Sequence, residues 1–148
     1  MTAKIIVGWR EWLSLPELGI DKIKAKVDTG ARTSCIHAFD VEEFSENGEN
    51  WVKFSTHPLQ DDEETIVECR AKVVERKYVT SSSGQRELRY FIETKLVAGN
   101  QSWPVRVTLS NRSTMKFRML LGRTAMENRI VVEHFFLQPL FFIADFIR

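Results

Sequence analysis

The segment Ile23-Lys-Ala-Lys-Val-Asp-Thr-Gly-Ala31 decides how the rest of the chain is interpreted. Its composition predicts a strand over Ile23–Val27, and this strand ends in a carboxylate, a hydroxyl and a glycine. Gly30 permits a tight turn, which places Asp28 at the mouth of a sheet. Asp and Gly are common turn residues, so the Asp-Thr-Gly tripeptide alone also fits an ordinary turn.

A second element near the carboxyl end narrows the interpretation. Met119-Leu-Leu-Gly122-Arg123 is an apolar strand that runs into Gly-Arg, and the one helix that the sequence predicts, Arg123–Asn128, opens just after Gly122. In this order and at this separation, the two elements resemble the retropepsin-like aspartic proteases. The resemblance implies that the apolar strand and the helix pack beneath a catalytic turn that contains Asp28.

Further pieces extend the resemblance over residues 5–134. Together they are similar to a bacterial subfamily of retropepsin-like enzymes that is often labelled "ATP-dependent zinc protease". The resemblance implies a peptidase that trims glutamate residues from the glutamylated carboxyl terminus of a small-subunit ribosomal protein, reversing an ATP-grasp ligase. The pieces are Val7–Trp12, Leu15-Pro16, Leu18–Ile20, Lys24–Ala38, Ser81–Tyr90, Trp103-Pro104 and Asn111–Arg123.

Short apolar runs separated by turn signals indicate an all-β barrel or sandwich. With the resemblance, we expect a mainly β, retropepsin-like closed barrel that forms a single domain over residues 1–148. Two long runs joined by Thr80–Gln85 predict a hairpin, which either packs in the barrel or forms a flap over a substrate. The predicted strands are Lys4–Trp9, Ile23–Val27, Trp51–Phe54, Ile66–Val79, Leu88–Val97 and Pro104–Leu109.

The chemistry of this family constrains the assembly. Aspartic proteolysis needs two carboxylates that share one proton, because like charges a few ångströms apart cannot both ionise. The chain offers one such aspartate, since it contains no second Asp-Thr-Gly and no Asp-Ser-Gly. We therefore predict a two-fold homodimer in which Asp28 of each copy forms the dyad. Thr29 would brace the dyad across the axis, and Gly30 would let the substrate backbone approach closely.

Basic residues near the turn predict an acidic substrate. Retroviral-type retropepsins commonly carry a carboxylate just after Asp-Thr-Gly-Ala, where it pairs with the arginine of the Gly-Arg element, but here that place is occupied by Arg32. Two guanidiniums cannot neutralise each other, so Arg32 and Arg123 favour an anion instead. We expect an acidic peptide or a glutamylated ribosomal protein tail, contacted by Ala31, Arg32, Arg86, Arg89 and Arg123.

The sequence gives little support to a metal or nucleotide cofactor. The histidines are His37, His57 and His134, without His-Glu-x-x-His, paired His spacing or Cys-x-x-Cys, and neither ATP-binding glycine loop occurs. We predict no cofactor and a structural role for His37, with metal binding beside Cys35 as the alternative. A zinc metallopeptidase and a non-catalytic peptide-binding barrel stay open as other functions. Both cysteines are expected to be free, buried thiols.

Composition and charge exclude some partners. Lys plus Arg number 21 and Asp plus Glu number 20, so the net charge of +1 gives no reason to expect nucleic acid or an anionic membrane. No apolar stretch is long enough to span a bilayer or to serve as a signal peptide, and we expect a cytoplasmic protein. The Phe-rich end, residues 135–147, is expected to form either a dimer contact or part of the core.

Overall fold

The chain folds almost entirely as β-strands. The structure is a computed structural model that describes residues 4–80, 83–111 and 116–132. Its strands are β1 (Ile5–Val7), β2 (Arg10–Leu15), β3 (Ile20–Val27), β4 (Ser34–His37), β5 (Phe39–Glu46), β6 (Glu49–Thr56), β7 (Val67–Thr80), β8 (Arg86–Ala98), β9 (Gln101–Ser110), β10 (Met119–Leu121) and β11 (Ile130–Val132). The helices within these ranges are the single turns η1 (Pro16–Leu18) and α1 (Arg123–Met126).

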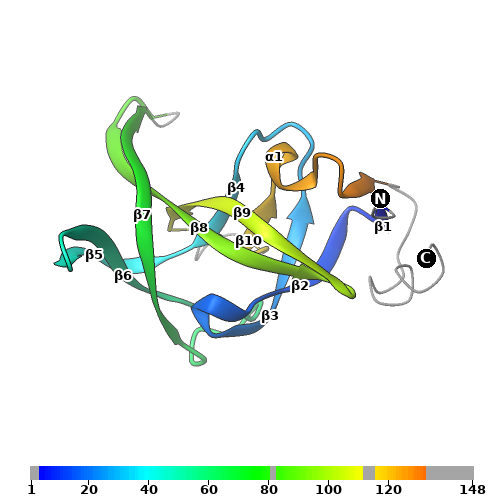
Figure 1. The fold of residues 1–148 in the computed structure, drawn as a ribbon, viewed down its shortest axis with the longest axis horizontal. Helices are drawn as coiled ribbons and strands as arrows, with labels where there is room; N and C mark the ends of the chain where they lie inside the picture. The colour runs from blue at the N-terminus through cyan, green and yellow to red at the C-terminus, as the bar shows by residue number, and fades with distance from the viewer. Residues whose placement is uncertain (1–3, 81–82, 112–115, 133–148) are drawn as a thin grey trace.

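Six strands close into a barrel (Figure 1). They are hydrogen-bonded in the order β2-β3-β10-β4-β9-β8, and β8 returns to β2 through the pairing of Ser14 with Val97. From β8 the sheet continues outside the barrel through β7 and β6 to β5. Closure pairs the strands around the ring and removes the open edges that a flat sheet would expose. The predicted mainly β, closed retropepsin-like barrel is therefore confirmed.

Alternation along the strands fills the barrel with apolar side chains. In β3, Ile23, Ala25 and Val27 are buried, whereas between them Lys24 is half-buried and Lys26 is exposed. Removing each large aliphatic side chain from water stabilises the fold by roughly 1.5–3 kcal/mol. The largest fully buried apolar side chains are Phe54, Ile5, Leu15, Ile20, Ile23, Ile36, Ile92, Leu96, Met119, Leu121 and Val7.

Two predicted elements have different boundaries in the structure. The run Lys4–Trp9 does not form one strand, because β1 pairs with β11 and the chain turns before β2 begins at Arg10. The backbone N–H of Gly8 at this break donates to the carboxylate of Glu11 at 3.0 Å. The predicted helix Arg123–Asn128 ends at Met126, since Asn128 adopts a left-handed φ of 61° that stops helical propagation.

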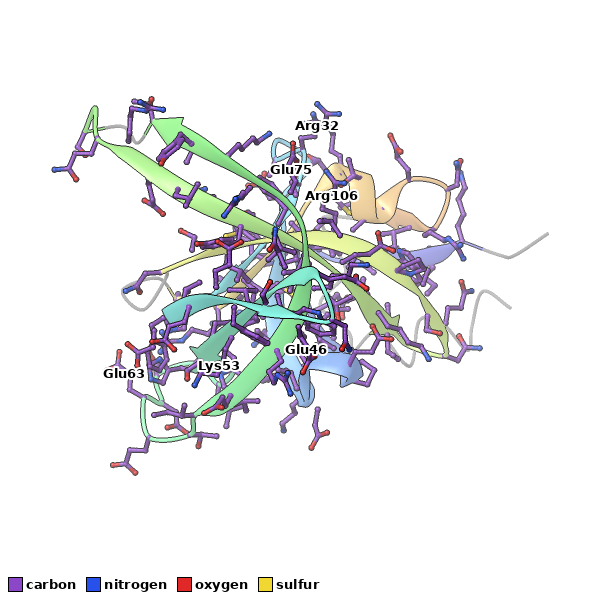
Figure 2. The ribbon with its side chains drawn as sticks, turned by 60° about the vertical axis from the view of Figure 1, so that its left-hand side comes forward. Arg32, Glu46, Lys53, Glu63, Glu75 and Arg106 are labelled. Atoms are coloured by element: carbon purple, nitrogen blue, oxygen red, sulfur yellow. The ribbon has the colours of Figure 1, made fainter. Side chains whose placement is uncertain are left out.

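The predicted long hairpin is present as β7 and β8. Its strands pair from Val73 and Ile92 out to Thr80 and Arg86. The outer half is largely exposed and stands away from the barrel (Figure 1). Figures 1 and 2 both place it at the same end of the molecule as the loop between β3 and β4. The hairpin therefore projects beyond the barrel instead of packing within it along its whole length.

The short strand β10 lies between β3 and β4, parallel to β3 and antiparallel to β4. At its end, Gly122 passes directly over the backbone of β4. A β-carbon at this position would lie 2.6 Å from the carbonyl carbon of Thr33 and 2.9 Å from the amide nitrogen of Ser34. No side chain fits there, so glycine is required by the close approach of two backbones.

Several other expectations concern the surface and the chain ends. Cys35 and Cys69 are buried thiols that form no disulfide with each other, as predicted. Burial, followed by the charge of Glu68, raises the pKa of the Cys69 thiol to about 12. Among the described residues, no helix has the length and apolar character that a membrane crossing requires. The Phe-rich segment 135–147 lies outside the described residues.

The close approach at Gly122 generates a stability prediction. Gly122→Ala is expected to lower the free energy of unfolding by about 2–3 kcal/mol, because the new methyl overlaps the Thr33 carbonyl group. Urea unfolding followed by fluorescence measures this change. Gly48→Ala is the matched control, since Gly48 has a φ of 76° and no atom within 4 Å of an added β-carbon. Its loss should be about 1 kcal/mol from backbone strain alone, and an equal loss in both variants would contradict the overlap.

Candidate active site

The turn that carries Asp28 is attached to the end of β10. The backbone N–H of Asp28 donates to the carbonyl of Leu121 at 2.9 Å, which continues the pairing of β3 with β10 by one residue. Within the turn, the Gly30 N–H donates to Asp28 Oδ1 at 3.0 Å, and the Ala31 N–H donates to the Asp28 carbonyl at 3.2 Å. Asp28 is half-buried, while Thr29 and Gly30 are exposed. The turn therefore holds a carboxylate in a fixed orientation at the surface of the barrel.

Arg123 braces the same turn from the other side. One guanidinium nitrogen, Nη1, donates to the carbonyl oxygens of Thr29 and Gly30, each at 3.1 Å. The backbone N–H of Arg123 also donates to the Ala31 carbonyl at 2.8 Å, and the next N–H reaches the Arg32 carbonyl at 3.0 Å. The first residues of α1 thus satisfy the loop's exposed carbonyls. Arg123, predicted from sequence as a substrate contact, lies with its guanidinium against the loop backbone.

Ser34 is a site residue that sequence reasoning missed. It is fully buried at the start of β4, and its Oγ accepts a hydrogen bond from the Gly122 N–H at 2.9 Å. This bond ties β4 to the glycine that packs over it. The signal in the sequence is weak, since a serine after Thr33 also fits a turn, and only the approach of Gly122 gives its hydroxyl a partner.

The predicted basic residues do not all gather at the turn, because two of them lie on the hairpin. Arg32 is exposed on the loop, and Figure 2 shows it at the top of the view. Arg86 lies over the ring of Tyr78, 4.4 Å from its centroid, on the hairpin. Arg89, also on the hairpin, pairs with Glu87 at 3.4 Å. Within the described part of the chain, neither hairpin arginine contacts the Asp28 turn through a hydrogen bond or ion pair.

A row of side chains connects the turn to the hairpin across the outside of the barrel. Strand register aligns, in order, Lys26, Leu120, Cys35, Thr108 and Phe91. Their neighbours along each strand point into the core, so this row faces away from it. Asp28 follows Lys26 by two residues and continues the same face. The row is exposed only at its Lys26 end, beside the candidate catalytic carboxylate; Leu120 is half-buried, and Cys35, Thr108 and Phe91 are buried.

His37 has a structural environment. It is fully buried, its Nε2 lies 2.9 Å from Nδ1 of His57, and the two rings stack at 5.0 Å. The Phe39 ring stacks on His57 at 4.5 Å. Across residues 4–80, 83–111 and 116–132, no three His, Cys, Asp or Glu side chains gather as metal ligands, and a zinc site needs three or four. The described residues therefore do not fit a zinc centre; His134 lies outside them.

Comparison with known proteins agrees with this geometry. A family model described as "RimB-like: Retropepsin-like aspartic endopeptidase RimB" matches residues 6–135. A protein of unknown function from Legionella pneumophila, Lpg0085, has a similar crystal structure, with a TM-score of 0.72 and 21% sequence identity, covering 88% of this chain and 93% of that one. At this identity the structural match shows the fold alone.

Curated relatives carry a different name from the one expected. Proteins named "Probable alpha-L-glutamate ligase" are 48% identical over 131 residues in Desulfotalea psychrophila and 48% identical over 133 residues in Parasynechococcus marenigrum. The matches cover 88% and 90% of this chain but 28% of each relative, so the chain spans less than a third of their length. The label "ATP-dependent zinc protease" is therefore not the name that these relatives or the family model carry.

The bracing of the turn by Arg123 can be tested directly. Arg123→Gln removes both bonds to the Thr29 and Gly30 carbonyls, and each exposed, charge-assisted bond is worth about 1 kcal/mol at most. We expect a small loss of global stability but faster hydrogen exchange at the Ala31 amide, read by mass spectrometry or NMR. Arg106→Gln, which removes an exposed pair with Glu75, is the control. Unchanged exchange in the 28–32 loop would contradict the bracing role.

Proposed function

The chain belongs to the RimB-like family of retropepsin-like aspartic endopeptidases, and on this basis we propose that it is an aspartic peptidase completed by a second copy of itself. The observation that carries the proposal is the turn at Asp28, a half-buried carboxylate held by backbone bonds at the end of a barrel strand. A single Asp-Thr-Gly per chain supplies half of a dyad. Two-fold symmetry supplies the other half.

The proposed reaction is hydrolysis by an activated water. The two Asp28 carboxyl groups hold one proton between them, since two carboxyl groups this close cannot both ionise. The ionised carboxylate takes a proton from water, whose oxygen attacks the peptide carbonyl carbon, while the protonated partner donates to the carbonyl oxygen. The C–N bond then breaks as the leaving nitrogen gains a proton. Thr29, exposed beside Asp28, would bond across the symmetry axis of this dimer.

The proposed substrate is an acidic, glutamate-rich carboxyl-terminal tail, of the glutamylated ribosomal protein type. Support comes from relatives that are named as glutamate ligases and share this region with the chain. A peptidase that recognises the same glutamate chemistry would hydrolyse what a ligase adds. Arg32, exposed on the loop, is the predicted arginine closest to Asp28 in sequence, four residues after it, and would attract carboxylates.

A second candidate is a peptide-binding module without catalysis. The observation that favours it is that the same region forms 28% of proteins named as ligases, where binding a glutamate tail would serve ligation without cleavage. This module would need the barrel and its basic residues but not a dyad. It would bind an acidic peptide equally well after loss of the Asp28 carboxylate.

Asp28→Asn tests the two candidates. Incubated with a peptide that ends in several glutamates, the wild type is expected to release shorter products, read by mass, and Asp28→Asn to lose at least about a thousandfold in rate because no dyad proton can be shared. Asp21→Asn, an exposed aspartate on β3 without the motif, is the control and should cleave normally. Tight binding without cleavage by the wild type would favour the module.

Arg32 generates a separate prediction. Arg32→Ala is expected to raise KM for the glutamate-tailed peptide by about threefold to tenfold, the effect of one exposed charge, with little change for the same peptide carrying glutamines. Steady-state kinetics on both peptides measure the difference. The control is Arg106→Ala, which removes an exposed arginine from β9. Equal changes with both peptides would exclude charge recognition by Arg32.

A further inference from the structure

The outer face of β2 and β3 carries an unusual set of cations. Four basic residues on this face, defined here as the basic strip, are Arg10, Lys22, Lys24 and Lys26. Register places Arg10 opposite Lys26 and Trp12 opposite Lys24, so these side chains share one surface. Trp12 lies among them with 42% of its surface exposed. The ammonium groups of Lys22 and Lys24 lie 5.2 Å and 5.5 Å from its ring centroid.

The basic strip has no counter-charge in the described part of the chain. None of its four residues forms an ion pair there, whereas Lys53, Lys72 and Arg106 on other strands each pair with a glutamate. The acids of β2 and β3, Glu11 and Asp21, occupy alternate positions, and the Glu11 side chain is buried against the Gly8 amide. Four like charges on one face raise the local potential and favour an anionic ligand.

Three of the four arginines predicted from sequence are less available than this strip, and Arg32 is the exception. Arg123 donates to the loop carbonyls, Arg89 pairs with Glu87, and Arg86 covers the Tyr78 ring. Lys22 and Lys24 on β3, in contrast, lie over the Trp12 ring, an interaction that leaves their charge uncompensated. The basic strip therefore offers several cations to a carboxylate on the strand that leads to Asp28.

We propose that the basic strip is a binding track for the acidic tail of the peptide substrate, which it leads toward Asp28. The proposal rests on the proposed peptidase function. Side chains on one face of a strand repeat about every 6.6–6.8 Å, and an extended peptide has the same repeat, so alternate glutamates match Lys22, Lys24 and Lys26. From Lys22 to Asp28 the strand spans about 20 Å. Several glutamates of one tail fit along this length.

The surface fits an acidic peptide better than a single-stranded nucleic acid. Nucleic-acid tracks combine cations with aromatic faces on which bases stack. The strip has two aromatic rings beside it, and cations lie over both: the Lys22 and Lys24 ammonium groups over Trp12, and the Arg10 guanidinium over Trp9, 4.6 Å from its centroid. A carboxylate needs only the ammonium groups as partners, and these stay positively charged while they lie over the ring. The glutamate tail of the proposed substrate supplies these carboxylates.

Binding of two fluorescent peptides tests the track. One peptide ends in six glutamates and the other in six glutamines, and binding is measured on the Asp28→Asn protein so that no cleavage intervenes. Lys22→Gln/Lys24→Gln is expected to lower the affinity for the glutamate peptide about tenfold at low salt, and to change the affinity for the glutamine peptide less than about twofold. The matched control, Lys53→Gln/Lys72→Gln, removes the same charge from β6 and β7 and should change neither affinity appreciably. Thermal unfolding checks that both double variants fold.

The outcomes separate this inference from the proposed function. If the wild type cleaves the peptide but Lys22→Gln/Lys24→Gln binds it as tightly as the unsubstituted protein, the track is wrong and the peptidase stands. If affinity depends on the two lysines while no cleavage occurs, the track stands and the peptidase fails. An equal loss of affinity in Lys53→Gln/Lys72→Gln would show that only the net charge of the protein matters, and would overturn the track. Tighter, lysine-dependent binding of a single-stranded oligouridylate would overturn the acidic peptide as ligand.

Discussion

The insertion of β10 between β3 and β4 is the constraint on which the candidate site depends. Its hydrogen bonds continue past the strand into the turn, where the Leu121 carbonyl accepts from Asp28. Gly122 then packs on the backbone of Thr33, and Arg123 donates hydrogen bonds to the carbonyls of the turn. A reactive carboxylate on an exposed loop would normally move freely. Here segments more than 90 positions apart hold it from both sides, so its position is a property of the whole barrel.

Charge is distributed unevenly over this barrel: some strands carry paired charges, and others carry cations that are available to a ligand. On β5, β6 and β7, basic side chains lie opposite glutamates, as in the pairs of Glu43 with Arg76 and Glu46 with Arg70. Exposed pairs of this kind add little stability, about 0–1 kcal/mol each, but they neutralise that face. On β2 and β3 the acids alternate with the cations instead of opposing them. A nearly neutral chain thereby keeps one strongly basic surface beside its candidate catalytic residue.

Much of the fold could be predicted from local sequence, and the misses have physical causes. Alternation and turn residues located β3, β6, β7, β8 and β9, because burial on one face of a sheet imposes a two-residue repeat. The strands β2 and β5 were missed, since polar residues such as Glu11 interrupt their apolar pattern. Whether Lys4–Trp9 is one strand or two depended on the partners β11 and β3, which lie far away in sequence.

Local sequence is enough to predict a strand that ends in Asp28, Thr29 and Gly30, an apolar strand before Gly122, and a barrel-forming pattern, because strand periodicity and turn chemistry are encoded within a few residues. Which charges are available depends on residues far apart in the chain. Arg123 bonds to the Thr29 and Gly30 carbonyls, whereas Lys22 and Lys24 form no ion pair within the described residues, because long-range register sets which side chains lie opposite each other. The residue type determines what a side chain can bind, and the closed barrel determines which partners lie close to that side chain.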